Sequence, residues 1–395
     1  MTHTLLRMLI VGFILPSFAF SQSTETITTK IKKSKIIDEK TDELDLKLKS
    51  QYLSQESELS KTNRFQARFE VVFNKEILPS FRFEFETAFN LENGQSDELY
   101  ENANEFTPEN NMTFRKGEFV WNPLEYKYLN AYAKAGAIKL KHSEGRDLLI
   151  GPNVYLGVSE HLDLNYKNYF AELSAYQTGP RNINTSNRLD RVDEGDPRFF
   201  MESLTIGYDP DYKSSYSDNY IKLNYSQFAF TDLSTSVAAT SYLQGNTVNL
   251  QDKSNGQFQY AYKGNTAGAS GNLRIYNFGI GARSETVINN SAPRNNQANL
   301  VGGYLSFYSG DSRFTLGLEN FKTQADATVA YYSNAIYRRT NVEGQKISFD
   351  YENRLSELEV GFDWVRAEDI FDSNLTKDSS EDIVVLFIRK SYEIF

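Results

Sequence analysis

Only a few side chains in this sequence could act as a nucleophile or a general base. The chain has no cysteine, and its three histidines are His3, His142 and His161. Ser159 and Asn165 lie close to His161 in the chain, so these three have the types of a nucleophile, a base and an orienting group. No nucleophile-elbow motif surrounds them, and a histidine beside a serine is common on strands. We therefore expect His161 to line a polar surface, and we predict no catalytic residue and no enzymatic activity.

The acidic sequence DRVDEGD is the best candidate for a metal site. Asp190, Asp193, Glu194 and Asp196 offer oxygen ligands for Ca²⁺, but they lack the spacing of an EF-hand. A transition-metal site is not expected either, because thiolates are absent and histidines are few. The glycines of segment 279–281 do not fit a phosphate loop, since glycine within a strand more often marks a bulge or bend. The sequence thus predicts neither a metal nor a cofactor.

Charged and apolar side chains alternate over long stretches of the chain. The segment RFQARFEVVFN at 64–74 places phenylalanines between arginine, glutamine and glutamate, and FRFEFETAFN at 81–90 repeats the pattern. Successive side chains of a strand point to opposite faces, so each segment predicts a strand with one apolar and one charged face. A helix would spread the same phenylalanines around its whole circumference.

Comparable alternation recurs up to the C-terminus and predicts about sixteen strands. Abundant aromatic residues (14%) and scarce proline (9 residues) also favour strands. Most segments are close to the length of about 9–11 residues that a tilted strand needs to cross a bilayer. The predicted strands cover residues 43–53, 64–74, 81–91, 112–122, 128–139, 153–163, 168–177, 198–208, 219–231, 256–263, 269–283, 299–309, 313–323, 345–353, 357–366 and 382–392.

Every second connection between these strands is short, and the others are long and polar. The short connections are NKEILPS, NPLEYK, NYK, DPDYKSSYSD, KGNTAG, GD and NRLS. Short turns at one end and long loops at the other are typical of an outer-membrane barrel, whereas a soluble sandwich needs no such alternation. The sequence predicts an all-β fold: a closed antiparallel transmembrane β-barrel of about 16 strands, within a range of about 14–18.

In such a barrel the apolar faces would meet lipid, because no strand edge can remain unpaired in hydrocarbon. Aromatic residues near the strand ends would form an interfacial girdle; they include Trp121, Tyr126, Tyr128, Tyr208, Tyr212, Tyr216 and Tyr220. The opposite faces would surround water. The charged residues that we expect to line this pore are Arg68, Glu70, Arg82, Glu84, Glu86, Lys222, Arg274, Asp350 and Glu352.

The N-terminal residues 1–21 have the features of a secretory signal peptide. Arg7 supplies the positive start, an apolar core follows, and Ala19-Phe20-Ser21 fits a cleavage site. We expect residues 22–42 to form a charged periplasmic segment and residues 43–395 to form the barrel. The chain has 42 basic and 52 acidic residues and a mean hydropathy of −0.52, which argues against helical membrane spans and against nucleic-acid binding.

The chain resembles Gram-negative outer-membrane porins. The terminal Phe395 resembles the insertion signal of outer-membrane barrels, although Tyr392 is out of phase with it. The run RKGEFVWNPLEYKYLNAYAKAGAIKL, with Lys116, Glu118 and Gly136, is similar to a turn and strand of the phosphate-selective porin O and P family. The resemblance implies location in the cell outer membrane, contact with its lipid and lipopolysaccharide, passage of small hydrophilic solutes, and assembly as a homotrimer.

The sequence therefore predicts a porin for passive diffusion of small hydrophilic solutes or ions. Inward charges of both signs would set a field across the lumen, and the acidic excess favours cations weakly. We expect an infolded loop at 91–111 or at 231–256 to narrow the pore. The sequence shows no continuous ladder of arginine and lysine that would favour phosphate. The alternatives are an adhesion or structural barrel with a plugged lumen, a barrel hydrolase, and a soluble exported β protein.

Overall fold

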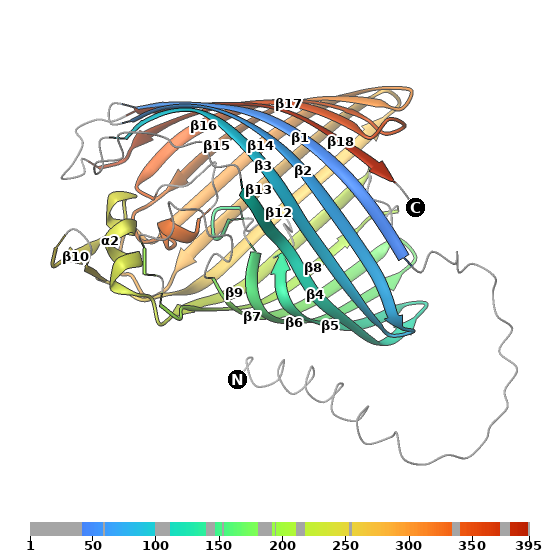
Figure 1. Ribbon diagram of the computed structural model, residues 1–395, viewed down its shortest axis with the longest axis horizontal. Helices are drawn as coiled ribbons and strands as arrows, with labels where there is room; N and C mark the ends of the chain where they lie inside the picture. Colours follow the sequence, from blue (N-terminus) through green and yellow to red (C-terminus); the bar gives the residue numbers. More distant parts are fainter. Residues whose placement is uncertain are drawn as a thin grey trace, which may run out of the picture.

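A computed structural model shows a barrel that closes on itself (Figure 1). The residues that it describes are 42–57, 60–98, 111–139, 147–151, 154–180, 192–193, 195–210, 218–252, 255–333, 340–371 and 380–393. The predicted signal peptide, the periplasmic segment up to residue 41, His142 and Phe395 lie outside these residues. Within them, no helix has the length and apolar character needed to cross a membrane.

Almost all of the described chain is antiparallel sheet. A small hairpin of β10 (Val248–Leu250) and β11 (Gly256–Phe258), the helix α2 (Thr235–Leu243) and the 3-10 helix η1 (Ala330–Tyr332) lie in connections between barrel strands. The barrel strands are β1 (Asp42–Ser57), β2 (Ser60–Leu78), β3 (Phe81–Glu98), β4 (Asn111–Tyr126), β5 (Leu129–Lys139), β6 (Val154–Tyr166), β7 (Tyr169–Gly179), β8 (Arg198–Tyr208), β9 (Tyr220–Thr231), β12 (Tyr262–Ile275), β13 (Phe278–Asn289), β14 (Gln297–Ser309), β15 (Ser312–Thr323), β16 (Val342–Asn353), β17 (Leu358–Asp369) and β18 (Ser380–Glu393).

The first and last strands pair with each other and close the barrel. Each strand is hydrogen-bonded to its neighbours in sequence order, and β12 follows β9 because the β10 and β11 hairpin stands apart. The register between β1 and β18 runs without a shift from Asp45 opposite Glu393 to Ser57 opposite Glu381. Closure leaves no free strand edge in the barrel. The predicted closed antiparallel barrel of sixteen strands is confirmed.

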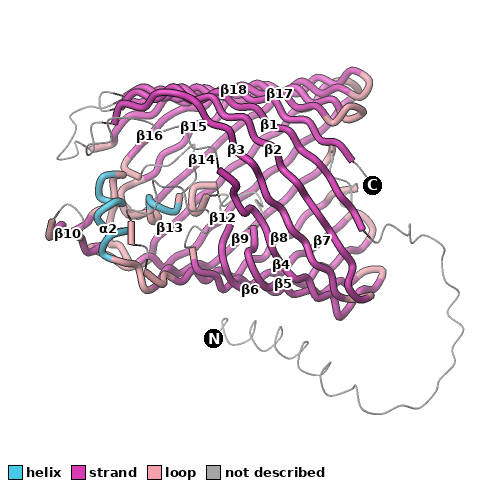
Figure 2. Tube along the Cα trace, in the orientation of Figure 1, coloured by secondary structure: helices cyan, strands magenta, loops and turns pink. Residues whose placement is uncertain are grey.

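The connections differ between the two ends of the barrel, as the sequence predicts. At one end, which we call the turn end, five connections consist of two residues each (79–80, 127–128, 167–168, 276–277 and 310–311), and the other two connections cover 209–219 and 354–357. Figure 2 shows that the helical segments lie together at the opposite end, which we call the loop end. The start of β1 and the end of β18 both lie at the turn end, because the number of barrel strands is even.

Two of the predicted strands are wrong. The segments 256–263 and 269–283 do not form separate barrel strands, and KGNTAG is not a turn. It belongs to β12, which continues to Ile275, and the chain reverses at Tyr276, whose φ of 55° fits a tight turn. Glycine and small polar residues in a sequence predict a turn, but here they let neighbouring backbones approach closely within the sheet.

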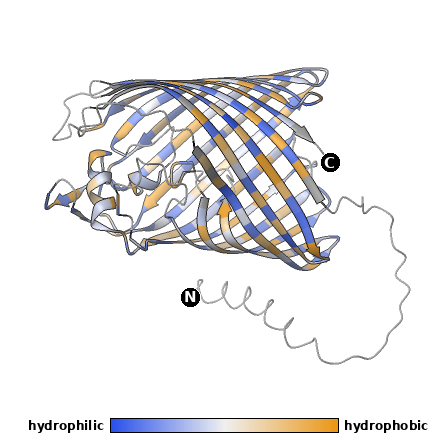
Figure 3. Cartoon of the chain, viewed as in Figure 1, coloured by the Kyte–Doolittle hydropathy of each residue, from blue (hydrophilic) through white to orange (hydrophobic). Residues whose placement is uncertain are grey.

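The outer face of the barrel carries a broad belt of exposed apolar side chains. Figure 3 shows the alternation along the front strands, where hydrophobic positions follow hydrophilic ones. A water-soluble monomer rarely exposes an apolar surface of this extent. The belt includes Phe65, Phe69, Phe89, Leu164, Ile206, Leu223, Ile280, Leu305, Leu316 and Ile388.

Exposed tyrosines gather at the turn end. Among the predicted girdle residues, Tyr126, Tyr128 and Tyr208 are exposed, whereas Trp121 and Tyr220 are half-buried. Tyr212 and Tyr216 lie outside the described residues. Tyr166, Tyr169 and Tyr276 join the exposed set, and the ammonium of Lys167 lies 5.4 Å from the ring centroid of Tyr166. Amphipathic rings of this kind suit a boundary between hydrocarbon and water.

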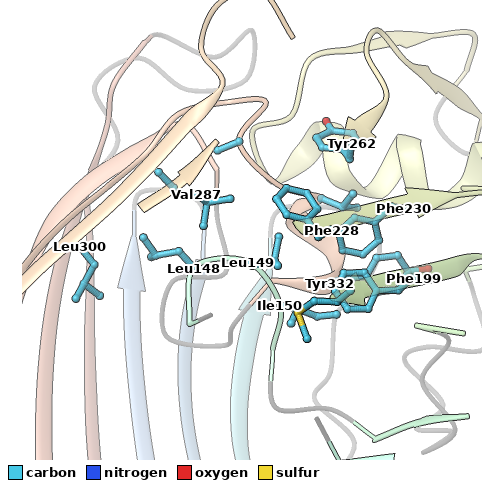
Figure 4. Packing of buried hydrophobic residues seen from close by; sticks show 14 of the residues in the cluster. Leu148, Leu149, Ile150, Phe199, Phe228, Phe230, Tyr262, Val287, Leu300 and Tyr332 are labelled. Atoms are coloured by element: carbon cyan, nitrogen blue, oxygen red, sulfur yellow. The ribbon is translucent and has the colours of Figure 1, made fainter. Parts of the chain in front are cut away.

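A separate apolar cluster fills part of the barrel near the loop end. The inner faces of β6 to β9 and of β12 to β17 each contribute buried side chains to it, such as Tyr155, Phe228 and Leu300. Figure 4 shows Leu148, Leu149 and Ile150 of a loop packed among them. No fully buried member comes from the described parts of β1 to β5 or of β18. The cluster therefore occupies one sector of the interior.

We predict that Gly264→Ala destabilises the barrel by about 1–3 kcal/mol, because a methyl group there would overlap the backbone carbonyl of Ile288 on β13. Gly303→Ala is the matched control, since its methyl group would approach nothing closer than 4.0 Å. The midpoint of denaturant unfolding of the folded barrel, followed by heat-modifiable migration, should fall for the first variant only. Equal midpoints for the two variants would contradict this packing.

Candidate functional site

A network of ion pairs covers the inner face of β2 to β4, opposite to the apolar belt. Arg115 Nε lies 2.8 Å from Glu86 Oε1, and Arg115 Nη1 lies 3.5 Å from Glu70 Oε1. Arg68 Nη1 is 3.8 Å from the same Glu70 oxygen, and Arg68 Nε donates to Asn90 Oδ1 at 2.7 Å. One carboxylate is thus shared by two guanidinium groups from different strands.

The network extends to β5 through two lysines. Lys116 Nζ donates to Glu84 and lies 3.2 Å from Glu118 Oε1, to which Lys134 Nζ also donates, at 2.7 Å. Arg82 Nε donates to Glu84 as well. The side chain of Glu118 is fully buried. A buried carboxylate is costly unless it is paired, so the two lysines hold Glu118 in its place.

A β-bulge in β4 allows two adjacent basic residues to join this network. Lys116 lies opposite Glu86, but the next pair joins Thr87 to Phe114, so Arg115 has no partner in the register. A bulge sets two residues against one and breaks the alternation of faces. Strict alternation predicts opposite faces for two adjacent residues, so neither Arg115 nor Lys116 was predicted to line the inner wall. The basic doublet within an alternating strand is the signal that could have indicated them.

The predicted pore-lining residues all lie on inner-face positions, but only some lie together. Arg68, Glu70, Arg82, Glu84 and Glu86 share the network on β2 to β5. Lys222 lies 4.5 Å over the ring of Tyr220, Arg274 pairs with Asp218 at 2.6 Å, Arg313 pairs with Glu352 at 2.5 Å, and Asp350 stands opposite Gly361. Their role in lining a pore stays a prediction.

A second group of charges lies on the opposite wall and includes a loop residue. Arg283 of β13 places Nη1 2.6 Å from Asp147 Oδ2 and Nη2 2.6 Å from Glu319 Oε1. Tyr304 of β14 donates its hydroxyl to Glu319. No pattern in the sequence predicted this group. Asp147 comes from the connection between β5 and β6, where no strand period indicates the direction of a side chain.

The segment 147–151 folds into the barrel and is held there by a buried carboxylate. Glu285 of β13 accepts hydrogen bonds from the backbone N–H groups of Asp147 at 3.0 Å and Leu148 at 2.8 Å. Thr328 donates its hydroxyl to the carbonyl of Leu149 at 2.7 Å. Leu148 and Leu149 are almost fully buried in the apolar cluster. Polar anchors and apolar packing therefore fix the same segment.

Two further loop segments are tied to each other beside it. The side-chain amide of Asn246, which follows α2, donates to the carbonyls of Ala325 and Thr328 and accepts from the N–H of Ala330. Asp326 accepts hydrogen bonds from the N–H and the hydroxyl of Thr247 at 3.1 and 2.7 Å. These bonds join the connection between β9 and β12 to the connection between β15 and β16. Together with segment 147–151, they form a structure that we call the internal plug.

The predictions for the two loops that were expected to narrow the pore have different outcomes. Of residues 91–111, the first eight continue β3 to Glu98, so that part of the prediction is wrong, and 99–110 lie outside the described residues. The loop 231–256 does turn inward, because Val237 of α2 is fully buried in the apolar cluster. The segment 147–151 was missed. It is short and apolar, and nothing in its sequence distinguishes it from the start of a strand.

His161 contacts a serine and an aromatic ring. Its Nε2 lies 2.9 Å from Ser159 Oγ, and its ring stacks on Tyr132 with centroids 4.4 Å apart. Asn165 Oδ1 is buried without a hydrogen-bond partner in the described structure. A catalytic base needs an orienting group within hydrogen-bond reach. The Asn165 oxygen therefore does not orient the imidazole of His161.

The acidic segment 190–196 is described only in part. Asp190 and Glu194 lie outside the described residues. Asp193 Oδ1 accepts a hydrogen bond from the N–H of Gly195 at 3.1 Å, and Asp196 is exposed. Within the described ranges, no group of three or more histidine or acidic residues is placed to hold a metal ion.

At the turn end, Asp218 connects distant parts of the rim. It accepts from Arg274 of β12 at 2.6 Å and from Arg354, in the turn between β16 and β17, at 2.7 Å. Partial burial alone would raise the pKa of the Asp218 carboxyl, but the hydrogen bonds and charges of the two arginines lower it below its usual value. The ionised carboxylate therefore holds Arg274 and Arg354 together at the turn end at neutral pH.

Comparisons with known proteins bear on the fold. No protein-family model matches the chain, and no curated protein matches its sequence. The barrel is similar to OprB of Pseudomonas putida at high pH, with a TM-score of 0.55 and 10% identity over 89% of this chain and 94% of that one. It also aligns with OccK7 of Pseudomonas aeruginosa, with a TM-score of 0.49 and 9% identity over 90% and 99% of the two chains. At such low identity the likeness establishes the barrel fold alone.

We predict that Glu285→Ala loosens the internal plug, because two backbone N–H groups would lose their acceptor inside the barrel. Amide exchange at Asp147 and Leu148, followed by mass spectrometry, should become at least about tenfold faster, which corresponds to about 1.4 kcal/mol. Glu343→Ala, which removes an exposed carboxylate paired with Lys322 at 2.6 Å, is the control. Unchanged exchange in the Glu285 variant would contradict the anchoring role.

We predict that Asp218→Asn lowers stability at pH 7 by about 0.5–1 kcal/mol, since both of its ion pairs are partly solvated. A carboxyl whose pKa is lowered on folding contributes stability above its unfolded pKa and loses that contribution as the pH falls through the folded pKa. The difference from the unmodified protein should therefore shrink below about pH 4. Denaturant midpoints measured from pH 7 to pH 3 test this, and a constant difference would contradict it.

Proposed function

We propose that this protein is an outer-membrane channel for passive diffusion of small hydrophilic solutes. The observation that carries the proposal is the contrast between the two faces of one closed sheet. The outer face exposes an apolar belt, and the inner face of β2 to β5 carries a network of ion pairs. Hydrocarbon requires that every backbone hydrogen bond be made within the protein, and a closed barrel meets this requirement.

The size of the barrel supports a water-filled path. Barrels of about eight strands fill their interior with side chains, whereas barrels of about 16–18 strands leave an aqueous channel. The internal plug and the apolar cluster occupy the sector of β6 to β17, and the described part of β1 to β5 contributes no fully buried side chain to that cluster. Solutes would therefore pass along the charged wall of β1 to β5.

Charges of both signs on facing walls would orient a solute in this path. The network on β2 to β5 mixes arginine and lysine with glutamate, and across the lumen Arg283 is paired with Asp147 and Glu319. Rings of charged side chains set selectivity in channels by their local field. The pore-lining residues proposed from the sequence belong to this field, together with Arg115, Lys116, Glu118 and Lys134.

The proposed channel function also implies where the protein is located and how it assembles. The exposed tyrosines at the turn end support a membrane boundary there, and short turns face the periplasm in barrels of this kind. Residues 1–21 would direct export, and the outer belt would contact lipid and lipopolysaccharide. We also propose that the protein forms a homotrimer and is related to the phosphate-selective porins. The sequence resemblance supports both proposals. We propose no catalytic activity.

A barrel with a plugged lumen, used for adhesion or structure, is the second candidate. The internal plug favours it, because the plug draws on three connections and on an apolar cluster that reaches the inner faces of many strands. The two functions differ in one measurable property. A plugged barrel conducts no ions, whereas a channel conducts them at all times.

Purified protein reconstituted in planar bilayers should give discrete conductance steps in KCl. Reversal potentials under a salt gradient then report the preference for cations or anions. The control is the same protein after heat unfolding, which should give no steps. A bilayer that stays closed with folded protein, as judged by heat-modifiable migration, would support the plugged barrel instead.

A further inference from the structure

Three basic residues stand in a row on the inner face of β18, β1 and β2. In the strand register, Lys49 of β1 lies opposite Arg389 of β18 on one side and opposite Arg68 of β2 on the other. Like charges directly opposite each other on neighbouring strands are destabilising. This row therefore needs anionic charge nearby, either from the protein or from a ligand.

The two arginines have carboxylate or amide partners. Arg389 Nη1 lies 2.7 Å from Glu359 Oε2, and Arg68 donates to Asn90 while lying 3.8 Å from Glu70. Lys49 has no carboxylate within salt-bridge distance in the described part of the chain, and its ammonium lies 5.7 Å from the ring centroid of Phe387. Positive charge is thus left over at the centre of the row.

An apolar surface adjoins this charge on the side of the loop end. Phe387 lies two positions before Arg389 on the same face of β18 and stands opposite Gly361 of β17, where an added methyl group would overlap its ring. The outer edge of the ring therefore lies against Gly361 of β17. Leu53 and Val385, a register pair on the same inner face, continue the apolar strip, and both are half-buried.

We propose that the wall of β18, β1 and β2 holds a binding site for an organic anion with an aromatic body. Its anionic group would contact Lys49 between Arg389 and Arg68, and its ring would stack on Phe387. An offset stack of two rings adds to the area that they bury, and the anion relieves the repulsion along the row. The site rests on the proposed channel function only for its use in transport, because binding itself needs no conductance.

The site is smaller than the whole charged wall and has a defined composition. Lys49 provides a compact point charge, and the planar guanidinium groups of Arg68 and Arg389 add positive charge on both sides of it. Without the anionic group, the apolar strip alone would hold a ring weakly. Without the ring, a small anion would be exposed to water on one side. Both parts are therefore needed for binding.

Calorimetric titration of the folded barrel in neutral detergent with benzoate tests this site without any use of conductance. We expect saturable binding of benzoate, about tenfold weaker binding to Lys49→Gln, a similar loss for Phe387→Leu, and unchanged binding to Lys322→Gln, whose lysine lies on the outer face paired with Glu343. Acetate and benzyl alcohol, which lack the ring or the charge, should each bind at least tenfold more weakly than benzoate.

Heat-modifiable migration checks that each variant is folded. Equal affinity of the folded Lys49→Gln variant and the unmodified protein for benzoate would overturn the site, and so would equal binding of benzyl alcohol. Benzoate binding without any bilayer conductance would leave the site standing and would argue against the channel. Conductance without benzoate binding would do the reverse.

Discussion

The pairing of β1 with β18 is the contact on which the rest of this structure depends. Without it, two strand edges would carry rows of unpaired N–H and C=O groups, which hydrocarbon cannot solvate. With it, every barrel strand has two neighbours, and the sheet acquires an inside and an outside. The division into an apolar outer belt and a charged inner wall has physical meaning only because the sheet is closed.

Closure also changes the free-energy cost of placing a charged side chain on the inner face. In an open sheet, Glu118 could turn toward solvent, but on the inner wall it is fully buried and depends on Lys116 and Lys134. The same dependence recurs at Arg283, which joins a loop carboxylate to a strand carboxylate. The inner wall is therefore held by reciprocal pairing. The row of Lys49, Arg68 and Arg389 differs because its central charge has no carboxylate partner in the described chain.

The internal plug shows how connections become part of the interior. Glu285 anchors backbone N–H groups of one connection, and Asn246 links two others through its amide. Apolar side chains of the barrel wall then bury the anchored segments. Because the plug is confined to one sector, it gives the barrel an asymmetric lumen. Because of this asymmetry, we expect solutes to contact the wall of β1 to β5.

The sequence by itself determined most of the strands, the two faces and the closed barrel. Period-two alternation depends only on the geometry of a strand, so residues such as Phe69 and Arg68 could be assigned to opposite faces without tertiary information. Tertiary structure decided what local periodicity does not encode. The bulge at Arg115, the reversal at Tyr276, the infolded Asp147 and the meeting of Lys49 with Arg389 all depend on contacts between residues far apart in the chain, or on the register between strands.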